Sequence, residues 1–187
     1  SLLLALFSVG IAIGSLACDR LSKHRVELGI VPLASLGISL FGYLLAYAAP
    51  TSLPNFAHFS DFLLYAPLWP LFGYLLLVGI CGGMFIVPLY TLLQQQAQVT
   101  QRAQVFAALN IYNSLFMVVS ALLGMVTLSI LNLSIIELFS ALSIANLLVA
   151  LYLLWEKPIH TLRFSLALAA KIAYRPSYKN IHHIPEQ

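Results

Sequence analysis

Five long runs of apolar residues constrain this chain more than any other feature of its sequence. The runs cover about residues 1–18, 30–49, 70–93, 105–129 and 135–155 of the 187. A helix needs about 20 apolar residues to cross the hydrocarbon core of a bilayer. Because lipid offers no hydrogen bonds, each crossing segment must satisfy its own backbone groups, and a helix does so. We therefore predict an all-α, polytopic membrane protein with about five transmembrane helices in residues 1–156.

The composition agrees with a lipid environment and argues against several soluble classes. Hydrophobic residues make up 61% of the chain and charged residues 8%, against about 45–50% and about 25% in soluble domains. The net charge of +3 is not gathered on a basic face with interleaved aromatic residues, so we expect no nucleic-acid partner. We find no nucleotide loop, metal-ligand cluster or nucleophile–base pair, and we therefore expect no enzyme activity, no metal and no cofactor.

The lysines and arginines predict how the helices are oriented. With five spans, every one of them falls on the same side of the membrane, and the positive-inside rule assigns that side to the cytoplasm. The N-terminus is then outside and the C-terminus inside. Tyr65 and Trp69 suit an aromatic belt at the outer surface. The nine basic residues are Arg20, Lys23, Arg25, Arg102, Lys157, Arg163, Lys171, Arg175 and Lys179.

A charged cluster separates the first two apolar runs. Residues 18–27 read CDRLSKHRVE and hold five of the fifteen Asp, Glu, Lys and Arg residues. One interpretation is a polar turn that anchors two helices and sets their orientation. The pattern also resembles the loop signature of the major facilitator superfamily, G-x-x-x-D-R-x-G-R-R, although Ser15 and Ser22 stand where that pattern has glycines. The resemblance implies a gating loop formed by Gly14, Asp19, Arg20, Lys23 and Arg25.

A second stretch resembles one branch of that superfamily, the lysophospholipid transporters. Residues 82–96 read GGMFIVPLYTLLQQQ, and residues 102–120 follow with two asparagines among small and apolar residues. The closest similarity is to transporter modules fused to an acyltransferase that recycles lysophosphatidylethanolamine. It implies helices 8–12 of a twelve-helix bundle in a bacterial inner membrane. The partners would be lipids, lysophospholipid, the missing N-terminal helices and a fused acyltransferase domain.

The C-terminal residues add two expectations, one from their own pattern and one from the resemblance. The basic and apolar residues of the segment 157–187 predict a helix on the inner membrane surface, followed by a linker toward a missing downstream domain. Their end is similar to the lead-in of glycerolipid acyltransferases, but no H-x4-D motif is reached, so no catalytic residue is assigned. The alternatives to lysophospholipid transport are a membrane anchor for the fused acyltransferase and a general exporter of small amphiphiles.

Glycines and a proline in the third run predict an irregular helix. Gly82, Gly83 and Pro88 together predict a broken helix of the kind that lines transporter cavities, because proline removes a backbone donor. Two G-x-x-x-G pairs, one at positions 10 and 14 and one at 79 and 83, predict close helix packing, with helix sliding during transport as the alternative.

Four polar residues inside or beside the apolar runs are candidates for cargo contact. Gln94 lies at the cytoplasmic end of the third run, where solvation at headgroup depth is the alternative. Asn110 and Asn113 lie in the fourth run, where amides need partners and can instead cross-link helices. Glu137 lies near the outer end of the fifth run. An ionisable group at that depth predicts a functional role, unless its side chain reaches the surface water.

Overall fold

The computed structural model describes residues 2–22, 28–50, 62, 65–156 and 166. Within these ranges five helices are long and apolar enough to cross a membrane, and no strand is present. A short 3₁₀ helix, η1 (Ala66–Leu68), leads into the third of them, and a π-helical segment, η2 (Val126–Ile130), follows the fourth. The predicted fold class, an all-α polytopic membrane protein, is confirmed. The five helices are α1 (Leu2–Ser22), α2 (Ile30–Ala48), α4 (Trp69–Gln96), α5 (Arg102–Met125) and α6 (Ile135–Glu156).

The helices match the predicted spans closely, with one difference that matters for the charged cluster. Helix α1 continues to Ser22, so Asp19 and Arg20 lie on its last turn rather than in a loop. Lys23 and Arg25, the other basic members of the predicted gating loop, lie outside the described residues. The predicted surface helix and linker of residues 157–187 also lie outside them, except for Leu166.

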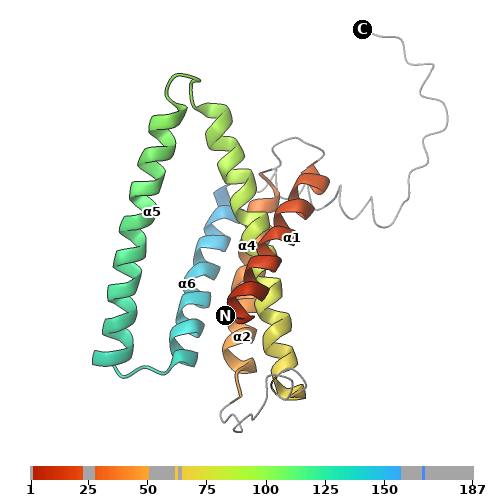
Figure 1. Cartoon of the computed structure of the whole chain (residues 1–187), viewed down its shortest axis with the longest axis vertical. Coiled ribbons are helices and arrows are strands. Elements are labelled where there is room, and N and C mark those ends of the chain that lie inside the picture. Colours follow the sequence, from red (N-terminus) through yellow and green to blue (C-terminus); the bar gives the residue numbers. More distant parts are fainter. Residues whose placement is uncertain (1, 23–27, 51–61, 63–64, 157–165, 167–187) are drawn as a thin grey trace, which may run out of the picture.

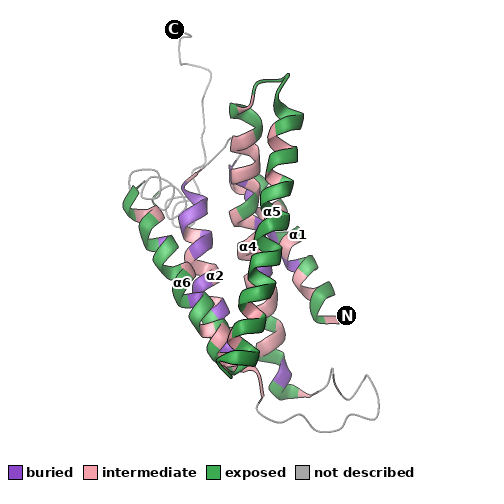
Figure 2. Cartoon of the chain, turned by 90° about the vertical axis from the view of Figure 1, so that its left-hand side faces the viewer, coloured by how far each residue is buried: buried purple, intermediate pink, exposed green. Residues whose placement is uncertain are grey.

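Four of the helices form a connected row, and the fifth stands apart from it. Helix α1 packs on α4, α4 packs on α2, and α2 packs on α6 (Figure 1). Helix α5 has no buried residue and is exposed along nearly its whole length (Figure 2). It is joined to α4 at one end and, through η2, to α6 at the other (Figure 1).

The contact between α1 and α4 is made by backbone. The buried residues of α1 are small and recur every fourth position: Gly10, Gly14, Cys18 and Ser22. Such a stripe lies on one face of a helix and lets another helix approach closely. A Cβ added at Gly10 would lie 3.1 Å from the Cα of Gly79, and one added at Gly79 would lie 2.6 Å from the carbonyl oxygen of Phe7. The two G-x-x-x-G pairs therefore face each other, as close packing predicts.

The contact between α2 and α6 is polar. The Nδ2 group of Asn146 donates to the carbonyl oxygen of Ser35 at 2.9 Å and to Oγ of Ser39 at 2.8 Å. One turn further along, a Cβ added at Gly42 would meet Oγ of Ser143 at 2.8 Å. Lipid cannot replace these hydrogen bonds, so they favour this pairing of helices.

The predicted break in the third span is wrong. Helix α4 runs without interruption for 28 residues, with Pro88 inside it. Gly83 is buried against α1, whereas a side chain at Gly82 would meet nothing within 4 Å. The helix persists because its medium offers no water to compete for backbone groups, and because packing on both sides holds it. Gly83 and Pro88 are thus buried in helix packing, whereas Gly82 is not. A role of the three in lining a cavity stays a prediction.

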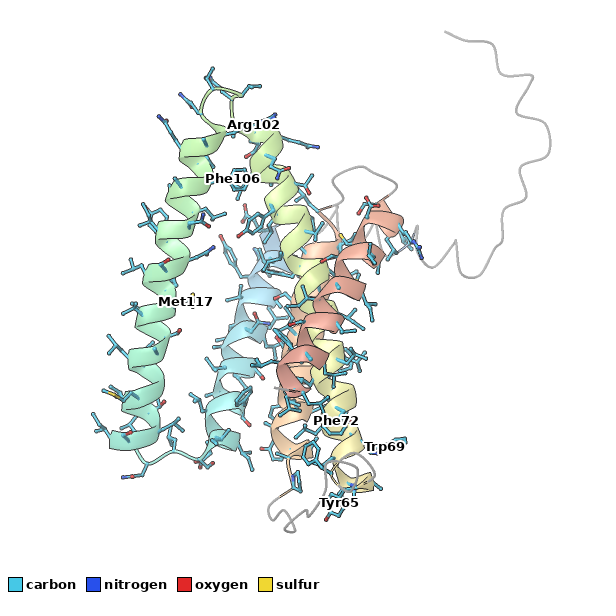
Figure 3. All side chains as sticks on the ribbon, in the orientation of Figure 1. Tyr65, Trp69, Phe72, Arg102, Phe106 and Met117 are labelled. Atoms are coloured by element: carbon cyan, nitrogen blue, oxygen red, sulfur yellow. The ribbon has the colours of Figure 1, made fainter. Side chains whose placement is uncertain are left out.

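The two ends of the bundle carry different side chains. Tyr65 and Trp69 lie at one end, near Phe72, and Arg102 lies at the opposite end (Figure 3). The rings of Phe62 and Phe72 meet edge to face, with their centroids 5.7 Å apart. Which of these ends faces the cytoplasm stays a prediction.

Candidate cargo site between α4 and α5

The one described contact that joins α4 and α5 through side chains centres on Tyr90. The ring of Tyr90 stacks with that of Phe106, with the centroids 6.2 Å apart and the planes 29° apart. Its hydroxyl accepts a hydrogen bond from Nδ2 of Asn113 at 3.4 Å. Two partly buried aromatic rings and one exposed amide thus meet between α4 and α5. We call this group of three residues the Tyr90 cluster.

One face of α5 continues the cluster. Phe106, Asn110, Asn113 and Met117 are spaced by four, three and four residues, so they lie on one side of the helix. Phe106 and Met117 both point from α5 toward the other helices (Figure 3). Met117 is nevertheless 71% exposed, because no helix in the described part of the chain covers this face beyond Asn113. The structure therefore has an open side that is polar near Tyr90 and apolar further on.

The polar candidates do not all join the cluster. Asn113 does, through its bond to Tyr90. Asn110 lies about one turn nearer the Arg102 end of α5 on the same face. It is exposed, and its side chain hydrogen-bonds none of the described residues. Gln94 follows Tyr90 by one turn of α4, so it shares that face and lies exposed near the helix end. Asn110 and Gln94 flank the cluster, and their side chains form no hydrogen bond with its members.

Glu137 forms part of the N-terminal cap of α6. Its carboxylate accepts hydrogen bonds from the backbone N–H of Ser134 at 2.7 Å and from the Ser134 hydroxyl at 2.8 Å. The backbone N–H of Glu137 in turn donates to Oγ of Ser134 at 3.2 Å. This reciprocal arrangement is a capping box, which satisfies the free donors of the first turn of α6. The acid therefore starts a helix and does not face the Tyr90 cluster.

The predicted gating loop is described only in part, because Lys23 and Arg25 lie outside the described residues, and it stays a prediction. Gly14 packs against the backbone of Ile80 in α4, and its role is helix contact. Asp19 and Arg20 are exposed on the last turn of α1. Five residues separate Gly14 from Asp19, so their side chains point about 140° apart around the helix. The glycine and the charged pair therefore belong to different surfaces.

Three contributors were missed by reasoning from sequence. Tyr90 and Phe106 looked like ordinary apolar-run residues, and Asn146 was passed over inside the fifth span. A lone amide in a long apolar run was a signal that could have identified Asn146, because such groups seek partners. The pairing of Tyr90 with Asn113 depends on how α4 and α5 turn toward each other. No group of three or more His, Cys, Asp or Glu side chains lies close enough to hold a metal ion in the described ranges.

Comparison with protein-family models, with curated proteins and with solved structures finds no match for this chain. The functional argument consequently stands on the residues and contacts given above. Those contacts describe a membrane protein with one polar and aromatic cluster on an open, largely apolar side.

Proposed function

We propose that this chain is the C-terminal part of a major-facilitator-type transporter that moves a lysophospholipid, such as lysophosphatidylethanolamine, across the membrane. The observation that carries the proposal is the amide of Asn113, held at the Tyr90 hydroxyl on a side of the bundle that no described helix covers. The sequence resemblance of residues 82–113 supports the choice of family. Five apolar helices are equally compatible with a membrane anchor, so the cargo is what an experiment must decide.

The cluster suits a cargo that has both a polar and an apolar part. The amide of Asn113 and the phenol of Tyr90 offer a donor and an acceptor in a lipid-like medium, so they attract polar groups. Further along the same face of α5 lies the exposed Met117, which suits a hydrocarbon chain. A single-chain lipid carries both parts in one molecule, whereas a fully polar solute would gain nothing from the apolar part.

Such a site needs a second wall. Transporters bind cargo between two helix bundles near the middle of the membrane. We propose that further helices of the same protein supply the other wall, and that a downstream acyltransferase uses the lipid delivered. This chain would then not transport by itself, although it would still contact the cargo.

Photo-labelling tests the proposal. The chain would be reconstituted in vesicles with a lysophosphatidylethanolamine that carries a photoactivatable group in its headgroup, and the labelled residues would be mapped by mass spectrometry. We expect labelling near Tyr90 and Asn113 that unlabelled lysophosphatidylethanolamine displaces and a diacyl lipid does not. The double substitution Tyr90→Phe with Asn113→Ala should weaken it, because both polar groups are lost.

The control is Tyr152→Phe, which removes an exposed tyrosine hydroxyl from α6, outside the Tyr90 cluster. It should leave the labelling unchanged. Labelling that spreads evenly over lipid-facing residues, and that the double substitution does not alter, would contradict the proposal. That result would favour the anchor function.

A further inference from the structure

The five helices are attached to each other with very different strength. Helices α1 and α4 touch backbone to backbone at four glycines, and α2 and α6 are joined by two hydrogen bonds from Asn146. Helix α5 has no buried residue, and its one described side-chain link to the other helices is the Tyr90 cluster. Segments with few buried contacts open at the lowest free energy. Of the described helices, α5 is therefore the one that moves most readily.

The outer end of α5 has the geometry of a hinge. The helix changes there into the π-helical segment Val126–Ile130, where the backbone N–H of Leu131 donates to the carbonyl oxygen of Val126 at 3.1 Å. The hydroxyl of Thr127 donates to the carbonyl oxygens of Leu123 at 2.9 Å and Gly124 at 3.0 Å. Helices bend sharply at π-turns and where side chains bond the backbone of the preceding turn. We therefore expect any bending of α5 at this end to occur within these few residues.

The inner half of α5 has the geometry of a latch. One hydrogen bond of 3.4 Å and one stacked ring pair tie it to Tyr90 of α4. The connection from α4 to α5, residues 97–101, is short and partly coiled: the backbone N–H of Gln101 donates to the carbonyl oxygen of Gln98 at 2.9 Å. Fully extended, five residues reach about 17 Å. The connection therefore permits α5 to swing by several ångströms and limits how far it goes.

We propose that α5 is a hinged gate: it pivots on Val126–Ile130, and the Tyr90 cluster latches its inner half to α4. Opening separates Asn113 from Tyr90. It increases the distance between α5 and α4, and the increase is largest at the predicted cytoplasmic end. Only the identity of the molecule that passes the gate rests on the proposed function. The hinge and the latch are properties of the chain without cargo.

Distances between paired spin labels test the gate. The chain would be studied in lipid vesicles without cargo, with Cys18 and Cys81 replaced by alanine. An inner pair of labels at positions 95 and 108 reports the latch, and an outer pair at 122 and 142 reports the hinge. We expect two populations for the inner pair, the shorter distance predominating, and one narrow population for the outer pair.

Two substitutions break the latch in different ways. Asn113→Ala removes the donor, and Tyr90→Phe removes the acceptor but keeps the ring. Each should raise the ratio of open to closed molecules by about threefold, the effect of a typical hydrogen bond between membrane helices. Asn110→Ala is the matched control, because it removes an amide from the same face that bonds none of the described residues; it should leave the ratio unchanged.

Three results would overturn the gate. They are one unchanging inner distance in every variant, a change confined to the outer pair, and an equal effect of Asn110→Ala and Asn113→Ala. Circular dichroism checks that each variant is folded. If Asn113→Ala does not fold, Tyr90→Phe still tests the latch by itself. A fixed α5 together with specific photo-labelling would remove the gate and leave the transport proposal intact. If α5 moves but the photo-labelling is not specific, the gate stands and the transport proposal fails.

Discussion

Adjacent glycines in α4 provide the sharpest test of how this bundle is held together. A Cβ added at Gly83 would lie 2.9 Å from the backbone nitrogen of Ser15 and 3.2 Å from the carbonyl carbon of Gly14, and it would also meet the carbonyl oxygen of Ile11. All three are backbone atoms of α1, so no side-chain rotation relieves the contact. At Gly82, one residue earlier, an added Cβ meets nothing within 4 Å. The pair therefore separates the effect of close packing from the effect of glycine itself.

The expected cost follows from the distances. Carbon atoms in ordinary contact lie about 3.5–4.0 Å apart, so Gly83→Ala pushes α1 and α4 apart by a distance on the order of 1 Å. Overpacking of this kind costs about 1–3 kcal/mol of the free energy of unfolding. Alanine recovers up to about 1 kcal/mol through its higher helix propensity. We expect a net loss of about 1–2 kcal/mol for Gly83→Ala and a gain of about 0.4–1 kcal/mol for Gly82→Ala.

Reversible unfolding in bicelles gives the measurement. The free energy of unfolding would be compared for the parent chain, Gly82→Ala and Gly83→Ala, with helix content checked by circular dichroism. Gly14→Ala should behave as Gly83→Ala does, since its Cβ would lie 2.8 Å from the carbonyl carbon and 2.9 Å from the Cα of Ile80. Equal stability changes at Gly82 and Gly83 would refute the reasoning, because they would mean that α1 and α4 are not in backbone contact.

Three further predictions use other contacts. Asn146→Leu should cost about 1 kcal/mol in the same unfolding assay, because two hydrogen bonds between α2 and α6 are lost; an unchanged stability would mean that they do not form. Ser134→Ala removes the cap of α6 and should cost about 1 kcal/mol; hydrogen exchange should then speed up in the first turn of α6 and nowhere else. N-ethylmaleimide should modify Cys18, which is 2% exposed, only slowly in the folded chain and rapidly once the chain is unfolded, in a time course followed by mass spectrometry; rapid modification of Cys18 in the folded chain would contradict the packing of α1.

The spans could be predicted from sequence because the requirement they meet is local. Each crossing segment must be long, apolar and helical by itself, whatever its neighbours are. The same local reasoning failed at Pro88, where a missing donor suggested a broken helix. Inside the bundle the helix has no alternative partner in water, and α1 and α2 hold α4 from the sides. The tertiary environment therefore outweighs the local preference of Pro88.

The site was less predictable, because it depends on which helices meet. Sequence marked Asn113 as an amide in need of a partner, and the structure supplies Tyr90, which lies 23 residues away in the chain. The depth of Glu137 in the sequence suggested an intramembrane acid, but its spacing from Ser134 also fits a capping box, and that local pattern is the one realised. Spacing within one helix could be read from the sequence, whereas contact between helices could not.

The position of Tyr90 links the glycine contact to the gate. Tyr90 lies two turns beyond Gly83 on α4, and backbone contact at Gly83 fixes α4 to α1. Tyr90 therefore cannot follow α5 when α5 swings, and the whole displacement appears as a change in the distance between Tyr90 and Asn113. Gly83→Ala should then broaden the inner spin-label distance as well as lower stability, because the latch loses its fixed side. If Gly83→Ala lowers stability and leaves that distance distribution unchanged, the latch is held by α5 and its connection alone, and the rigidity of α4 plays no part in gating.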